Sequence, residues 1–119
     1  MAYKLIITEE AEQLLDRQIQ YLLYRLKNEQ AAIHLLDETE RIYERLADNP
    51  YQFPQSKDTC LQKIGYREAI CTGMNYVIIF RAENTSVYVL GIFHQLENYR
   101  KKVLPPKESG RIFNRPYQA

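Results

Sequence analysis

Three apolar runs in the second half of the chain, separated by very short connections, constrain the fold more than any other feature. The runs are KIGYREAIC (63–71), NYVIIFRA (75–82) and SVYVLGIF (86–93). The connections TGM and ENT have the length of hairpin turns, so the runs predict a three-stranded antiparallel meander. The second and third runs are apolar on both faces and predict central strands, whereas the first contains Arg67 and Glu68 and predicts an edge strand.

The first half of the chain predicts one strand followed by two amphipathic helices. The strand is residues 3–8, and Thr8 is a good N-cap for a helix that continues to about Lys27. Asn28 marks a break before a second helix from about Glu29 to Ala47. Apolar side chains recur every three or four residues in both helices, at Ala11, Leu15, Ile19, Leu22, Leu23 and Leu26 and then at Ala32, Leu35, Leu36, Thr39, Ile42, Tyr43 and Leu46.

The short break between the helices predicts an antiparallel helical hairpin. The hairpin would cover the apolar face of the meander, which gives an α+β fold in the form of a two-layer sandwich. A loop is expected from the end of the second helix to about residue 62. We expect one domain over residues 1–104 and a loosely attached C-terminal extension over residues 105–119, which Ile112, Phe113 and Tyr117 could pin to a surface.

Composition narrows the functional classes. The sequence has no run near the roughly 20 apolar residues of a membrane helix, and its N-terminus is unlike a signal peptide, so we expect a cytoplasmic protein that does not bind membranes. The net charge of +1 is too small for a protein that binds nucleic acid mainly through its phosphates. The charge is also uneven, because acids concentrate in residues 9–48 and cations in residues 99–115.

No cofactor or metal site is predicted. The glycines form neither a phosphate-binding loop nor a dinucleotide fingerprint. Cys60 and Cys71 match no zinc or redox spacing, and Cys71 is expected to pack as a small apolar residue on a strand. His34 lies among leucines of the second helix and is expected to have no catalytic role.

A basic and aromatic set on the predicted sheet is the remaining candidate site. It consists of Lys63, Tyr66, Arg67, Arg81, His94, Tyr99, Arg100, Lys101 and Lys102. Such residue types could cleave RNA through its own 2′-hydroxyl, since His can transfer protons near neutral pH and cations can stabilise the phosphate in the transition state. The same residues are also consistent with a solvated basic rim or a protein-binding surface.

The stretch NYVIIFRAENTSVYVLGIFHQLENY (75–99), together with the order of the elements, resembles the RelE/ParE superfamily of type II toxin–antitoxin toxins. The shared features are a strand of the form Y-x-apolar-x-F/Y-R, a short acidic turn, a V-Y-V-L-x-I strand, and a final His followed five residues later by Tyr. The likeness covers residues 3–104.

The resemblance implies a small toxin that a cognate antitoxin neutralises, with one of two targets. RelE-like members cut messenger RNA on the ribosome, whereas ParE-like members inhibit DNA gyrase and cleave nothing. RelE-like cleavers usually hold basic residues at the positions of Val77 and Gln95, and the long first helix resembles the ParE-type hairpin. These departures favour the gyrase inhibitor slightly over the ribosome-dependent endoribonuclease, and an inactive binding module of the same fold is a third possibility.

The resemblance also implies roles for residues if the chain is a nuclease. His94 would then transfer the proton, and Tyr99 would stack on or orient the RNA. Arg67, Arg81 and Lys101 would contact the phosphates.

Overall fold

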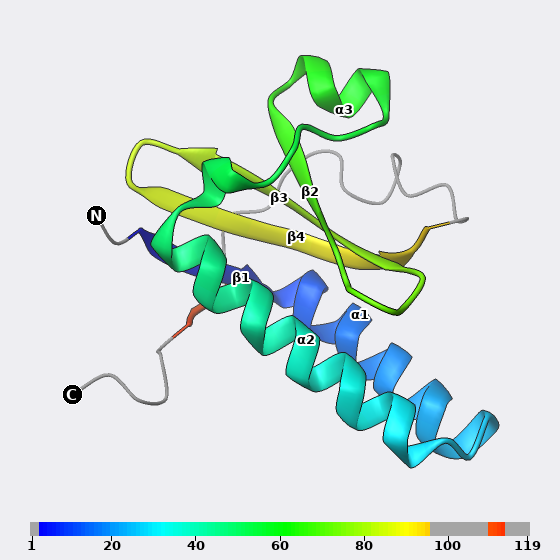
Figure 1. Ribbon diagram of the computed structural model, residues 1–119. Coiled ribbons are helices and arrows are strands. Elements are labelled where there is room, and N and C mark those ends of the chain that lie inside the picture. The colour runs from blue at the N-terminus through cyan, green and yellow to red at the C-terminus, as the bar shows by residue number, and fades with distance from the viewer. Residues whose placement is uncertain (1–2, 96–109, 114–119) are drawn as a thin grey trace.

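A mixed β-sheet with a helical hairpin on one face forms the body of the molecule (Figure 1). The computed structural model describes residues 3–95 and 110–113, and within them the sheet has five strands in the order β2-β3-β4-β1-β5. The strands are β1 (Lys4–Thr8), β2 (Tyr66–Ile70), β3 (Tyr76–Glu83), β4 (Ser86–His94) and β5 (Gly110–Ile112).

The predicted meander is confirmed. β2, β3 and β4 pair consecutively and antiparallel, with β2 at the edge and β3 and β4 in the interior of the sheet. The chain makes the turn between β3 and β4 with Asn84 at a φ of 56°, a left-handed conformation that Asn tolerates better than most residues.

β1 pairs in parallel with β4, so that the N-terminal strand lies beside the last strand of the meander. Thr8 fixes this junction, because its hydroxyl donates to the Val89 carbonyl at 2.8 Å and accepts from the Ala11 N–H at 3.2 Å. Thr8 therefore caps the first helix, as predicted, and it also ties this helix to the central strand, which was not predicted.

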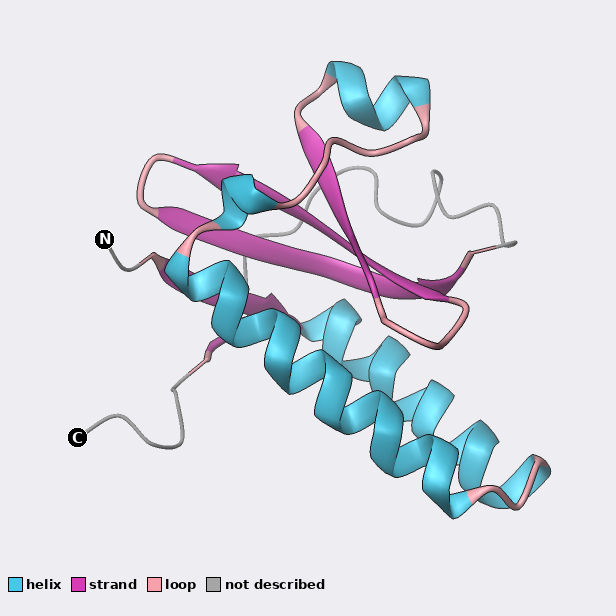
Figure 2. Cartoon of the chain, viewed as in Figure 1, coloured by secondary structure: helices cyan, strands magenta, loops and turns pink. Residues whose placement is uncertain are grey.

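The two long helices lie side by side along one face of the sheet (Figure 2). They are α1 (Glu9–Gln20), which continues into a π-helical turn at Tyr21–Arg25, and α2 (Glu29–Asp48). The helix was predicted to continue to about Lys27; its last turn is π-helical and ends at Arg25, and the chain then reverses at Lys27, whose φ is 50°. Asn28 caps α2 by accepting from the Ala31 N–H.

The main core lies between the hairpin and the sheet, which confirms the predicted two-layer α+β arrangement. From the helices it contains Leu35, Ile42 and Leu46, none of them more than 3% exposed. Opposite them, Ile78 and Phe80 of β3 are fully buried.

The segment from the end of α2 to about residue 62 was predicted to be a loop. This prediction was wrong, because the segment contains two short helical parts, Pro50–Gln52 and α3 (Thr59–Lys63). Asp58 caps α3 by accepting from the Cys60 and Leu61 N–H groups, so β2 begins at Tyr66 rather than at residue 63. Leu61 packs on the second face of the sheet, in a smaller cluster that also holds Tyr66, Val77, Ile79, Leu90 and Phe93.

Part of the expected C-terminal extension belongs to the sheet. β5 pairs antiparallel with β1, and Phe113 is buried with its ring against the Tyr43 ring, at 5.4 Å between centroids. The anchoring expected of Phe113 is thus observed, whereas Ile112 is 48% exposed and Tyr117 lies outside the described residues.

Candidate functional site

His94 ends β4 on the sheet face that carries the helices. Its ring lies edge-on against the Tyr76 ring, at 5.8 Å between centroids, and the two residues are direct partners across β3 and β4. The other groups expected near it from the C-terminal side, Tyr99, Arg100, Lys101 and Lys102, lie outside the described residues.

Arg67 lies on β2 and its guanidinium holds the preceding loop. One guanidinium nitrogen donates to the Phe53 carbonyl at 2.7 Å, and the group stacks over the Tyr51 ring at 4.9 Å. The neighbouring Lys63 is exposed at the end of α3. Arg67 thus connects the edge strand to residues 51–53.

Arg81 lies on the opposite face of the sheet from Arg67. It is the cross-strand partner of Tyr66, lies 3.3 Å from the Glu83 carboxylate and stacks over the Tyr88 ring at 4.2 Å. Burial raises the pKa of Tyr66, and the Arg81 charge opposes this rise. The Tyr66 hydroxyl is buried and has no hydrogen-bond partner among the described residues.

The strand register shows that these residues do not converge. Arg67 pairs with Phe80, and His94 pairs with Tyr76, which lies four residues away along β3. Four residues of extended chain span roughly 14 Å. Arg81 faces the other side because successive side chains of a strand alternate.

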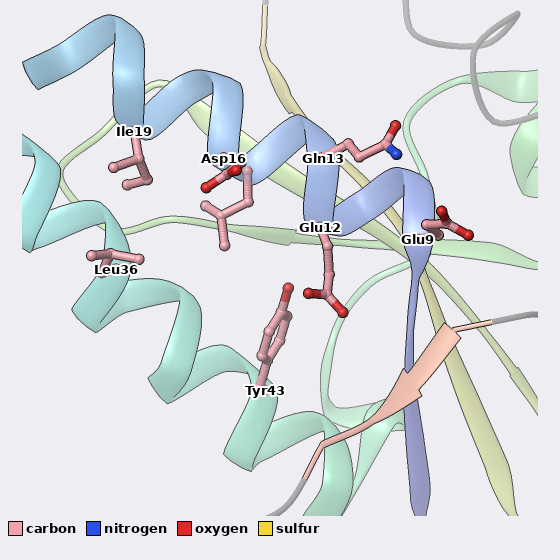
Figure 3. Close-up of a pocket in the computed structure, with 8 residues that line it drawn as sticks. Glu9, Glu12, Gln13, Asp16, Ile19, Leu36 and Tyr43 are labelled. Carbon is pink, nitrogen blue, oxygen red and sulfur yellow. The ribbon is translucent and has the colours of Figure 1, made fainter. Parts of the chain in front are cut away.

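A groove lies between α1 and α2. Its volume is about 790 Å³, and it lies on the side of the hairpin away from the central strands (Figure 3). Its lining consists of the acids Glu9, Glu12 and Asp16, the amide Gln13, and the apolar or aromatic residues Leu15, Ile19, Leu36 and Tyr43.

Side chains from the two helices face each other in this groove. Figure 3 shows Glu12 and Tyr43 pointing toward one another, and Ile19 and Leu36 doing the same further along the hairpin. Leu36 is 44% exposed although its position in the apolar stripe predicted a core residue. The apolar face of α2 is wider than the surface that the sheet covers, so part of it stays exposed. The width of this apolar face was the signal in the sequence for an exposed apolar surface.

No group of His, Cys, Asp and Glu in residues 3–95 and 110–113 has the arrangement of a metal site. Within the same residues, no helix is long and apolar enough to cross a membrane. His34 is exposed and its Nε2 lies 3.0 Å from the Thr72 carbonyl oxygen.

Two comparisons relate this chain to known proteins, one through a family model and one through a shared fold. A family model described as the ParE toxin of a type II toxin–antitoxin system, parDE, matches residues 5–99. A chain from the solved structure "Chromosomal ParDE TA system from P. aeruginosa" shares the fold with a TM-score of 0.63 at 17% sequence identity. That alignment covers 78% of this chain and 96% of the other. A search of curated proteins found no match.

Proposed function

This chain belongs to the ParE toxin family of type II toxin–antitoxin systems, and on that premise we propose that it arrests growth by inhibiting DNA gyrase. In this proposal the protein does not cleave RNA. A cognate antitoxin binds the toxin and keeps it inactive until the antitoxin is lost.

The separation of His94 from the two arginines is the observation that carries this proposal. Proton transfer in RNA cleavage requires a group within hydrogen-bond reach of the reacting atoms, with cations beside the phosphate. Arg67 is roughly 14 Å along the sheet from the His94 position, and Arg81 faces the other side. Both arginines also contact protein groups, namely the Phe53 carbonyl and the Glu83 carboxylate.

The environment of Val77 gives further support. The resemblance to RelE-like nucleases puts a cation at this position, but Val77 is 1% exposed and packs in the cluster with Ile79 and Phe93. A charged side chain there would lose its hydration without gaining a partner. The second basic position of the nucleases is occupied by Gln95, which is exposed.

The test combines two assays on the same purified protein. We expect trapped gyrase–DNA breaks in a gyrase cleavage assay and intact messenger RNA in a translating extract. The variant His94→Ala should retain full growth arrest, because no chemistry depends on the imidazole. Cleaved messenger RNA that is lost in His94→Ala, together with intact gyrase activity, would refute the proposal.

That refuting result would establish the runner-up, a ribosome-dependent endoribonuclease. His94 would then be the proton-transfer residue, Tyr99 the stacking residue, and Arg67, Arg81 and Lys101 the phosphate contacts. Normal growth after induction in the absence of antitoxin would instead identify an inactive binding module.

The partner proposed for neutralisation is a protein encoded beside this chain. The solved structure that shares the fold is described as a ParDE toxin–antitoxin system, which supports such a partner here. Co-expression with the neighbouring reading frame should restore growth, and the two proteins should copurify. Persistent arrest with a well-expressed neighbour would count against this pairing.

A further inference from the structure

We infer that a rigid patch of arginine and tyrosine side chains beyond the end of α2 is the surface through which the toxin binds an acidic surface of gyrase. The patch consists of Arg45, Tyr51, Gln52 and Arg67, and we call it the arginine–tyrosine patch. This inference rests on the proposed inhibition of gyrase. It adds which surface of the toxin binds the target and what chemistry the target presents there.

Contacts among these side chains hold the patch together. The Arg45 guanidinium lies over the Phe53 ring, 4.5 Å from its centroid, and its Nε donates to the Gln52 side-chain oxygen at 3.0 Å. The Arg67 guanidinium lies over the Tyr51 ring at 4.9 Å and donates to the Phe53 carbonyl at 2.7 Å. Phe53 therefore contacts both arginines and joins them into one cluster.

Phe53 also anchors the patch to the core of the domain. Its side chain is buried, and its ring lies edge-on against the fully buried Phe80 ring, at 5.8 Å between centroids. Tyr51 has a second aromatic contact, with the Tyr3 ring at 6.3 Å between centroids. Side chains that are already held in this way lose little conformational freedom when a partner binds, and this favours affinity.

The patch is open to solvent although its side chains are held in place. Tyr51 is 50% exposed, Arg45 and Gln52 are exposed, and Arg67 is partly exposed. Tyrosine and arginine are among the residue types that contribute most of the binding energy in protein–protein interfaces. The patch therefore combines the composition of an interface centre with a fixed geometry.

The charge of the patch selects an acidic partner. Arg45 and Arg67 contact an amide, a carbonyl and two aromatic rings, none of which carries a net charge. Among the described residues neither guanidinium forms an ion pair with a carboxylate. The exposed acid nearest in the sequence is Asp48, three residues after Arg45, and the two arginines outnumber it.

These charges define what the target presents. A guanidinium can bind a carboxylate through two parallel hydrogen bonds, so we expect Asp or Glu side chains of gyrase beside Arg45. An apolar or planar side chain of gyrase should pack on the exposed Tyr51 ring. A nucleic acid fits less well, because two arginines neutralise few phosphates and the whole chain has a net charge of only +1.

The experiment measures gyrase inhibition in the cleavage assay and the dissociation constant between the full-length toxin and purified gyrase. Tyr51→Ala and Arg45→Glu disrupt the patch. Each should raise both the dissociation constant and the toxin concentration for half-maximal inhibition by a factor of about 10 or more, as for central interface residues. Tyr51→Phe keeps the ring and should change both quantities less than about twofold. Wild-type binding should weaken as salt is raised, and this dependence should be smaller in Arg45→Glu.

Matched controls lie in the turn at the other end of the helical hairpin (Figure 1). The 20 residues of α2 separate this turn from the patch, and at 1.5 Å per residue they span roughly 30 Å. Tyr24→Ala truncates a tyrosine that is 72% exposed, and Arg25→Glu reverses an exposed cation. Both controls should change gyrase binding less than about twofold, and circular dichroism should show folded protein for every variant.

The possible failures are distinguishable. Unchanged gyrase inhibition by Tyr51→Ala and Arg45→Glu would overturn the patch as the docking surface and leave the proposed function standing. A wild-type toxin that neither binds nor inhibits gyrase would overturn both.

Two further results would assign the patch to another occupant and so overturn the inference. The first is binding of the wild-type toxin to a DNA duplex without gyrase that is lost in Arg45→Glu, which would identify a nucleic acid. The second is loss of antitoxin binding in Tyr51→Ala and Arg45→Glu while both still inhibit gyrase normally, which would identify the antitoxin.

Discussion

At the scale of single residues, Glu38 is a buried acid that joins the hairpin to the sheet. It is 6% exposed and accepts a hydrogen bond from the Thr72 N–H at 3.1 Å, and it also pairs with Arg41. Thr72 begins the turn between β2 and β3, and its carbonyl lies beside His34. Two polar side chains of α2 therefore hold this turn, a role that their polarity in a helix did not predict.

Replacement of Glu38 should be much more harmful than replacement of a nearby exposed acid. Glu38→Ala leaves the Thr72 N–H without its acceptor, and an unsatisfied buried group of this kind destabilises by about 1–3 kcal/mol. Glu40→Ala, on the exposed side of the same helix, should change the free energy of unfolding by less than about 0.5 kcal/mol. Urea denaturation measures both, and equal effects would contradict the assigned role.

Cys71 is the second informative residue, because its thiol is fully buried. Burial, and then the neighbouring Glu38 carboxylate, raise the pKa of Cys71 from 9.0 to about 12. Cys60, in contrast, is exposed. Because the thiolate is the reactive form, Cys71 should be inert to thiol reagents in the folded protein.

The raised pKa makes stability depend on alkaline pH. Below pH 9 the Cys71 thiol is protonated in both states, and its contribution to stability is complete. From pH 9 to about 12 the unfolded chain loses this proton and the folded chain keeps it, so the free energy of unfolding decreases as pH rises. Between pH 8 and 10.5 wild type should lose roughly 2 kcal/mol more than Cys71→Ala.

Cys60→Ala is the control for this pH dependence. It should follow the wild-type curve at every pH, since Cys60 is exposed. Urea denaturation across the pH range measures the free energy of unfolding of each variant. If this free energy changes with pH in the same way in wild type and Cys71→Ala, the pKa of the Cys71 thiol is not raised by folding.

At the scale of elements, Gly91 lies beside a bulge in β4 and is in close contact with the first helix. The register with β3 shifts between Ile79 and Phe80, which pair with Gly91 and Val89, so Leu90 is the extra residue. A Cβ atom on Gly91 would lie 2.6 Å from the Phe93 ring and 3.0 Å from Leu14 of α1. Glycine is therefore required here for close packing.

Gly91→Ala should destabilise the fold by overpacking. The expected loss is about 1–3 kcal/mol in the free energy of unfolding, because the Phe93 ring is fully buried and has little room to move. Phe93→Leu removes the ring atoms that clash. The double variant should therefore be less destabilised than the sum of the two single variants, by at least about 0.5 kcal/mol. Strict additivity in thermal or urea unfolding would argue against the clash.

At the scale of the whole molecule, β5 makes the C-terminal residues part of the domain. The Phe113 N–H donates to the Leu5 carbonyl at 2.9 Å, and its ring packs against Tyr43 of α2. One residue thus contacts both the N-terminal strand and the helical layer, so the fold closes through a segment beyond the family match at residues 5–99.

Loss of the Phe113 ring should therefore affect global stability. Phe113→Ala should lower the free energy of unfolding by about 3 kcal/mol, as large-to-small changes in a core do. Ile112→Ala, at a side chain that is 48% exposed, should lower it by less than about 1 kcal/mol. Similar values for the two variants would indicate that β5 adds little to the stability of the domain.

The sequence alone determined those features that depend on local spacing. The 3.6-residue and two-residue periods and the three-residue connections predicted the helical hairpin, the meander and its edge strand. The motif from Tyr76 to Tyr99 predicted the toxin superfamily, and the match over residues 5–99 confirmed it. The helix cap at Asp58 and the following Gly65, with a φ of 87°, were also local signals, and they mark the α3 segment that was predicted as a loop.

The tertiary structure decided how distant segments meet. The pairing of β1 with β4 joins Thr8 to Val89, which are 81 positions apart, and no local pattern specifies such a neighbour. The same long-range register separates Arg67, Arg81 and His94, which residue types alone had grouped into one site. The position of every strand in the sheet decides which side chains share a face and which apolar side chains stay exposed. The groove with Leu36 could therefore be recognised only in the folded chain.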